Sequence, residues 1–173
     1  MSRIYLSPEQ QTLAATVGTE IYEARKAERY SERRDPSNPA ISNIRGLLAE
    51  MVFEEWTEGR CPANTKVFTD RPKDVCDFRA GPLLGDVKSN ILGGSLAVRQ
   101  GTARHNLYVL VWLEPKNQWG KVVGWTTQEA VRAAKKYNYH NHYLDMQHVV
   151  SPRDLRSMDE FKKLYWDVLG GCQ

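Results

Sequence analysis

The segment 74–88 constrains the fold of this chain more than any other, because its pattern is that of a tight β-hairpin. Residues 75–80 and 83–88 each alternate between apolar and polar side chains, as expected of strands that bury one face. Between them lie Gly81 and Pro82, which supply the unusual φ and the fixed φ that a short turn needs. The sequence therefore predicts an antiparallel hairpin with a two-residue turn.

Two carboxylates and a lysine fall on one face of this predicted hairpin. With a two-residue turn, the register places Asp77 directly opposite Asp86, and Lys88 follows two residues later on the same face. The side chains expected to face the core are Cys76, Phe78, Ala80, Leu83 and Val87. Like charges that face each other across two strands are destabilising, so we expect a cation between the carboxylates. Mg²⁺ is the natural candidate because it prefers oxygen ligands.

The order of these residues resembles the PD-(D/E)xK nuclease superfamily. In this resemblance Asp77 is the first acid and Asp86-Val87-Lys88 is the acid-x-Lys motif, while residues 46–50 resemble the Gly-x-x-x-Glu helix that often precedes the hairpin. The matching residues lie within 43–90. The pattern departs from the usual one at Cys76, which replaces a proline, and in having Asp rather than Glu as the second acid.

The resemblance implies a restriction-endonuclease-like fold of the α/β (α+β) class, with a central mixed β-sheet flanked by helices. It also implies a Mg²⁺-dependent deoxyribonuclease, with Mn²⁺ as a substitute for Mg²⁺. Glu50, Asp77 and Asp86 would hold the metal, with the backbone carbonyl of Val87 as a further ligand. Lys88 would orient or deprotonate the attacking water, or balance charge on the phosphate. The implied catalytic residues are thus Glu50, Asp77, Asp86 and Lys88.

Length and composition fit an ordinary globular protein. The 173 residues suit a single domain, 1–173, in which residues 1–40 add an N-terminal helix and a basic loop to the core. A net charge of +3 permits nucleic-acid binding without requiring it. The sequence has no apolar run of membrane-spanning length and no signal peptide, which predicts a soluble, cytoplasmic protein without a membrane partner. Three scattered cysteines predict reduced thiols.

Hydrophobic periodicity and capping signals predict the other elements. Helices are expected at residues 8–30, 43–58, 126–136 and 157–170. Capping boxes predict the N-caps of three of them: Ser7 with Gln10, Thr126 with Glu129, and Ser157 with Glu160. Gly46 suggests close packing inside the second helix, because glycine costs about 1 kcal/mol in a helix interior. Strands are expected at residues 65–69, 95–100, 107–113, 121–125 and 146–150. The run 107–113 is the most continuously apolar and is therefore the expected central strand.

Several basic residues outside the hairpin are candidates for binding DNA phosphates. They are Arg33, Arg34, Arg99, Arg104 and His105. A solvated surface explains each of them as well as a phosphate contact does. Gln100 is a further candidate, as a polar residue that supports the site.

Three functions are compatible with these observations. The first is a metal-dependent DNA endonuclease that acts in phage DNA processing, repair or recombination. The resemblance suggests that this enzyme is a homodimer. If it is encoded by a phage, it would act in the cytoplasm of the host. The second is a catalytically inactive DNA-binding or assembly module on the same fold. The third is a metal-dependent enzyme that acts on a different phosphate ester. Taken alone, Asp86 and Lys88 are better explained by an exposed ion pair that contributes less than about 1 kcal/mol. That ion pair does not explain the opposed Asp77 or Glu50 on the preceding helix, which favour the nuclease site.

Overall fold

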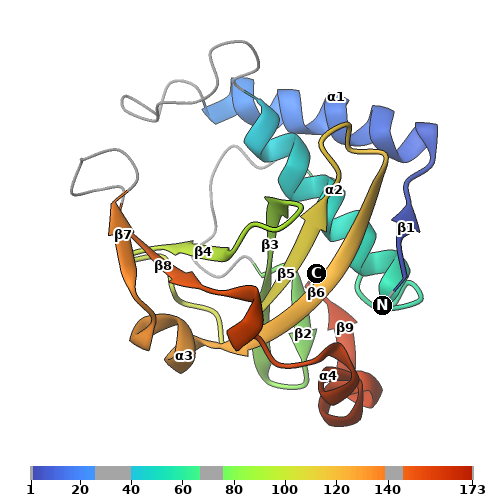
Figure 1. Cartoon of the computed structure of the whole chain (residues 1–173). Helices are drawn as coiled ribbons and strands as arrows, with labels where there is room; N and C mark the ends of the chain where they lie inside the picture. Colours follow the sequence, from blue (N-terminus) through green and yellow to red (C-terminus); the bar gives the residue numbers. More distant parts are fainter. Residues whose placement is uncertain (1, 26–39, 67–75, 139–145, 173) are drawn as a thin grey trace.

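A six-stranded mixed β-sheet forms the centre of the structure (Figure 1). The computed structural model describes residues 2–25, 40–66, 76–138 and 146–172. The strands of this sheet are β1 (Ile4–Tyr5), β2 (Phe78–Ala80), β3 (Leu83–Ile91), β5 (Leu107–Leu113), β6 (Trp119–Thr127) and β9 (Leu169–Gly171). They lie in the order β1-β6-β5-β3-β2-β9, in which β3 and β5 are parallel and the other neighbours are antiparallel. The prediction of a mixed sheet flanked by helices is confirmed.

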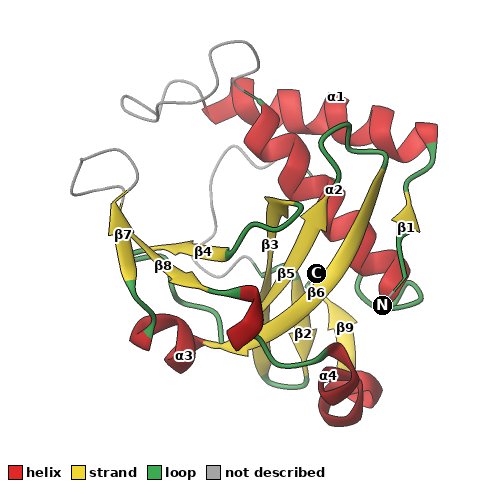
Figure 2. Ribbon diagram, viewed as in Figure 1, coloured by secondary structure: helices red, strands yellow, loops and turns green. Residues whose placement is uncertain are grey.

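Helices α1 (Pro8–Arg25) and α2 (Ile41–Trp56) pack against each other, and α2 contacts β3, β5 and β6 (Figure 2). The buried residues of α2 are Leu47, Leu48, Ala49, Met51, Val52 and Phe53. The predicted capping box of α1 is confirmed: the Ser7 N–H donates to the Gln10 side chain (2.8 Å), and the Gln10 N–H donates to Ser7 Oγ (3.2 Å). None of the described helices is long and apolar enough to cross a membrane.

A second, antiparallel sheet lies against the opposite face of β5. It contains β4 (Leu96–Arg99), β8 (Met146–Val150) and β7 (Lys136–Asn138) in that order, and α3 (Gln128–Ala133) packs against β8. Apolar side chains of both sheets and of α3 form one buried cluster, which comprises Leu96, Val98, Ala103, Tyr108, Leu110, Val131 and Val150. The other face of β5 packs in the main core through Val109 and Val111. Both faces of β5 are therefore buried, which explains its continuous apolar run.

The predicted strands form over most of the described residues. Those predicted at 95–100, 107–113 and 146–150 correspond to β4, β5 and β8, and the one predicted at 121–125 is longer, as β6. Of the strand predicted at 65–69, residues 65 and 66 are not in a strand, and the rest lie outside the described residues.

Two of the predicted helices have wrong boundaries. α2 begins at Ile41 rather than at Asn43, and its N-cap residue Ala40 makes no side-chain cap. The helix predicted at 126–136 is shorter, because its N-cap is Thr127, whose Oγ1 accepts a hydrogen bond from the Ala130 N–H (3.3 Å). Residue 136 belongs to β7 instead.

The C-terminal residues form a strand that helical periodicity did not predict. The last helix, α4 (Met158–Tyr165), begins as expected, with Ser157 Oγ accepting a hydrogen bond from the Glu160 N–H (3.2 Å). It ends five residues before the predicted end at Gly170. A short 3₁₀ turn follows, and β9 then pairs with β2, with Leu169 opposite Ala80.

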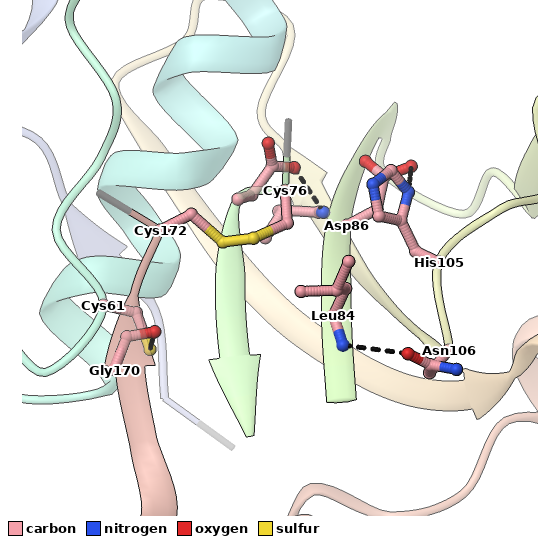
Figure 3. Close-up of a disulfide and its surroundings, with 10 residues drawn as sticks. Cys61, Cys76, Leu84, Asp86, His105, Asn106, Gly170 and Cys172 are labelled. Carbon is pink, nitrogen blue, oxygen red and sulfur yellow. Dashed lines mark hydrogen bonds and ion pairs between the residues drawn. A yellow bond between two sulfur atoms is a disulfide. The ribbon is translucent and has the colours of Figure 1, made fainter. Parts of the chain in front are cut away.

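The prediction that all cysteines are reduced thiols is wrong. Cys76 and Cys172 form a disulfide, with their Cα atoms 5.8 Å apart, and only Cys61 is a free thiol (Figure 3). The pairing of β9 with β2 brings the two cysteines together from positions 96 residues apart in the chain. The spacing of the three cysteines along the chain does not predict this disulfide, because the two cysteines meet only when the sheet forms.

Gly85 is required by close packing inside the hairpin, and this predicts a marked effect of substitution. A Cβ atom at Gly85 would overlap the ring of Phe78, which is fully buried. We expect Gly85→Ala to lower the free energy of unfolding by about 1–3 kcal/mol, as overpacking does in other cores. Urea unfolding would measure this change.

Gly46 is the matched control for that measurement. The sequence suggested close packing at Gly46, yet a Cβ atom there would meet nothing within 4 Å. Gly46→Ala in the interior of α2 should therefore raise the free energy of unfolding by up to about 1 kcal/mol. Equal effects of the two substitutions would contradict the packing described for Gly85.

Candidate active site

The hairpin has the predicted register. Ala80 pairs with Leu83 and Phe78 with Gly85, and the turn residue Gly81 has a φ of 59°. Strand pairing ends at Phe78, so Asp77 lies just before β2 rather than within it. The Asp77 N–H still donates to the Gly85 carbonyl (2.9 Å). Asp77 is therefore held beside β3 at the position that the register requires.

The side chain of Asp77 lies next to the backbone of the acid-x-Lys strand. Its Oδ2 accepts a hydrogen bond from the Val87 N–H at 2.7 Å, which is at the short end of the usual range for such bonds. The carboxylate thus binds a backbone amide of β3 at the point where β2 no longer pairs with it. Val87 directly follows Asp86 in β3, so this hydrogen bond holds the Asp77 side chain beside Asp86.

Asp86 lies on the face of β3 that is opposite the main core. An exposed position was predicted for it, but the structure buries it. Asp86 is only 8% exposed, and Tyr108 lies beside it on the neighbouring parallel strand. Its Oδ2 contacts Lys88 Nζ at 2.7 Å and His105 Nδ1 at 3.4 Å. Lys88, His105 and the neighbouring Tyr108 thus surround the Asp86 carboxylate.

Glu50 reaches the site from α2. Its Oε2 accepts a hydrogen bond from the Asn64 N–H (3.0 Å), and one turn later Glu54 accepts one from the Ala63 N–H (3.1 Å). The two carboxylates thus tie the segment after α2 to the helix. Glu55 accepts a hydrogen bond from the Gln10 side chain (3.0 Å) and so links α2 to α1.

Burial and mutual repulsion raise the carboxyl pKa values of Glu50 and Asp77. Burial raises the pKa of Glu50 to about 7, and the charge of Asp86 adds to this effect. The pKa of Asp77 is raised well above its usual range by burial and by the charges of Glu50 and Asp86. Glu50, Asp77 and Asp86 are therefore close enough for each charge to act on the others.

Asp86 and Lys88 form the compensated part of the site. Burial alone would raise the pKa of Asp86, but Lys88 and His105 outweigh it and lower this pKa to about 2. Burial opposes the charge of Lys88, but Asp86 outweighs burial, so the pKa of Lys88 is raised. In the described structure Lys88 is an ammonium paired with the Asp86 carboxylate.

The oxygen atoms that would suit a hard divalent cation are the carboxylates of Glu50, Asp77 and Asp86. Among the residues that the structure describes, no three His, Cys, Asp or Glu side chains lie close enough together to form a complete metal site. The donor chemistry nevertheless fits a cation, because a positive charge would relieve the repulsion that raises the carboxyl pKa values of Glu50 and Asp77.

The remaining predicted residues are not brought into this site. Arg99 and Arg104 are exposed, and Gln100 is exposed in the turn after β4, where its N–H donates to the Met146 carbonyl (2.7 Å). Arg33 and Arg34 lie outside the described residues. His105, which the sequence marked only as a phosphate-binding or solvated residue, lies against Asp86 instead. Knowledge that β3 pairs in parallel with β5 would have revealed this contact, because His105 lies just before β5.

No known protein family, curated protein or solved structure matches this chain in the comparisons made with them. The class of protein is therefore argued from the geometry and chemistry of the site.

The raised pKa of Glu50 predicts how the stability of the metal-free protein depends on pH. Its folded-state value of about 7, against an ordinary 4.5, means that the folded state retains a proton that the unfolded state loses. The free energy of unfolding should therefore fall as pH rises from about 5 to 8, by up to about 3 kcal/mol from this group. Urea unfolding in EDTA across this range would measure the fall.

Glu50→Gln provides the control for this pH dependence. Glutamine can still accept the Asn64 N–H bond but carries no charge. The variant should be more stable than the parent at pH 8 and nearly unchanged at pH 5. A variant that is equally destabilised at both pH values would show that Glu50 acts only through its hydrogen bond.

Proposed function

We propose that this chain is a metal-dependent DNA endonuclease of the PD-(D/E)xK type, with a restriction-endonuclease-like core. One observation carries the proposal: Glu50, Asp77 and Asp86 come from a helix and the two sides of a hairpin, and their charges act on one another beside Lys88. A lone exposed ion pair would explain Asp86 and Lys88 but not the two additional, half-buried acids Glu50 and Asp77. One departure is that a strand, β4, follows the acid-x-Lys strand where the superfamily usually has a helix.

In this proposal the acids hold a divalent cation at the end of the hairpin. Asp77, Asp86 and Glu50 supply carboxylate oxygens, and the Val87 carbonyl is the further ligand. When bound, Mg²⁺ or Mn²⁺ would lower the pKa of a water molecule and neutralise charge on the scissile phosphate. The hydrogen bond from the Val87 N–H orients the Asp77 carboxylate for this role.

Lys88 acts in this proposal as a positive charge that positions the phosphate or the attacking water. Its ammonium group lies 2.7 Å from Asp86 Oδ2, and its side chain is 32% exposed, so it is both anchored and accessible. Stabilisation of developing negative charge by a positioned cation contributes about 10²–10³-fold to the rate in comparable sites. This role requires no deprotonation of Lys88.

The second candidate function is a DNA-binding or assembly module without catalysis. The direct ion pair between Lys88 and Asp86 favours it, because the lysine neutralises the carboxylate that a metal would use. The lack of a complete set of metal ligands among the described residues also favours a module without catalysis. DNA is the partner in both proposals, whereas a homodimer and a cytoplasmic location stay predictions.

The test is a cleavage assay with supercoiled plasmid, branched DNA and a small chromogenic phosphodiester. We expect cleavage of DNA with Mg²⁺ or Mn²⁺, none with EDTA, and binding with little turnover in Ca²⁺, which tolerates irregular geometry. DNA binding without cleavage in any of these ions would favour the inactive module. Cleavage of the small ester but not of DNA would point to a different phosphate ester as substrate, and full DNA cleavage in EDTA would contradict the proposal.

A further inference from the structure

His105 lies at the candidate site although it is not part of the acid-x-Lys pattern. It belongs to the segment that leads into β5, and its side chain is 18% exposed. Its Nδ1 lies 3.4 Å from Asp86 Oδ2 (Figure 3). The same oxygen contacts Lys88 Nζ. The Lys88 ammonium and the His105 imidazole nitrogen thus converge on one carboxylate oxygen.

The backbone around His105 is fixed by several hydrogen bonds. Asn106 binds Leu84 twice: its side chain accepts from the Leu84 N–H (3.0 Å), and its own N–H donates to the Leu84 carbonyl (2.8 Å) (Figure 3). The His105 N–H donates to the Tyr108 hydroxyl (3.2 Å), and the two rings meet edge to face with centroids 6.2 Å apart. The imidazole is therefore held over β3 by two neighbouring residues rather than carried on a free loop.

The distance between His105 and Asp86 matches the spacing of two ligands on one cation. At 3.4 Å it is longer than the 2.7–3.2 Å usual for an N–H···O hydrogen bond. Metal–ligand bonds of about 2.1 Å at angles of about 90–110° place adjacent ligand atoms about 3.0–3.4 Å apart. The pair therefore has the geometry of metal ligands more nearly than that of a strong hydrogen bond.

We propose that His105 Nδ1 is a nitrogen ligand of the divalent cation that Asp86 binds, and that the site consequently selects Mn²⁺ over Mg²⁺. This inference rests on the proposed metal-dependent function. Mg²⁺ is bound almost entirely by oxygen, whereas first-row transition ions accept imidazole, so one histidine shifts the preference of an otherwise carboxylate site.

The test uses Mn²⁺ alone, without DNA, and reads its magnetic coupling to nitrogen. Electron spin-echo measurements on the wild-type protein should show modulation from a directly bound ¹⁴N, and the pattern should change when all histidines carry ¹⁵N. In His105→Asn we expect this modulation to disappear, the Mn²⁺ affinity to fall at least about 10-fold, and the Mg²⁺ affinity to change much less. His148→Asn is the control, because His148 is buried in the second sheet and pairs along β4 and β7; its variant should keep the modulation.

Each outcome separates this inference from the proposed function. Mn²⁺ binding to the wild-type protein without nitrogen modulation, or modulation that persists in His105→Asn, would overturn the role of His105. DNA cleavage with Mg²⁺ in that case would leave the proposed function intact. Failure of the wild-type protein to bind Mn²⁺ and to cleave DNA would overturn both. Absence of nitrogen modulation in the wild-type spectrum would overturn the inference even if His105→Asn is too unstable to study, and in that case His105→Gln takes the place of His105→Asn.

Discussion

Asp86→Asn is expected to reduce metal-dependent DNA cleavage by at least about 10²–10³-fold, because it removes the one carboxylate that contacts both Lys88 and His105. Lys88→Ala should reduce cleavage by a similar factor through loss of positive charge near the phosphate, while leaving the acids in place. Cleavage of plasmid DNA in Mn²⁺ under single-turnover conditions would measure both effects. Arg79→Gln, at an exposed position on β2 of the same hairpin, is the matched control and should cleave at the parental rate.

The same Asp86→Asn variant should be less stable than the parent in EDTA. Simple repulsion between opposed Asp77 and Asp86 would predict a gain, but Asp86 is already compensated by Lys88 and His105. Its removal leaves Lys88 partly buried without its partner, at a loss of about 1–2 kcal/mol after allowance for solvent exposure. Parental cleavage by both Asp86→Asn and Lys88→Ala would contradict the active-site assignment, and increased stability of Asp86→Asn would contradict the described ion pair.

Cys172→Ser is expected to be the most destabilising of the substitutions considered. The disulfide with Cys76 spans 96 residues, and the chain-entropy estimate for a loop of that length is about 4–5 kcal/mol. The lost cross-link also releases β9, which pairs with β2 only through three residues. Urea unfolding of the oxidised parent and of the variant would measure the difference.

A reducing agent provides the control for this prediction. Dithiothreitol should destabilise the parent by nearly the same amount as Cys172→Ser does and should have little further effect on that variant. Cys61 is buried and unpaired with another cysteine, so the reductant should not act through it. If the reductant leaves the parental unfolding curve unchanged, the disulfide makes no contribution to stability.

Local signals in the sequence were sufficient wherever a structure depends on neighbouring residues. The turn at Gly81 and Pro82 fixed the hairpin register, because only that two-residue loop lets Ala80 meet Leu83. Ser7 and Ser157 predicted helix starts correctly, because an N-cap hydrogen bond spans three residues. For α3 the predicted N-cap, Thr126, is wrong by one residue, because the observed N-cap is Thr127. The two adjacent threonines offer the same chemistry, and the position at which β6 ends decides between them.

What the sequence by itself determined is the hairpin, its register and the order of its acids along the chain. The tertiary structure alone decided which of these acids is compensated: the parallel pairing of β3 with β5 brings Tyr108 and His105 to Asp86, and α2 brings Glu50. It also joined Cys76 to Cys172. The reason is physical, because the energy of a charge or a thiol depends on what surrounds it, and here the surroundings come from segments distant in the chain.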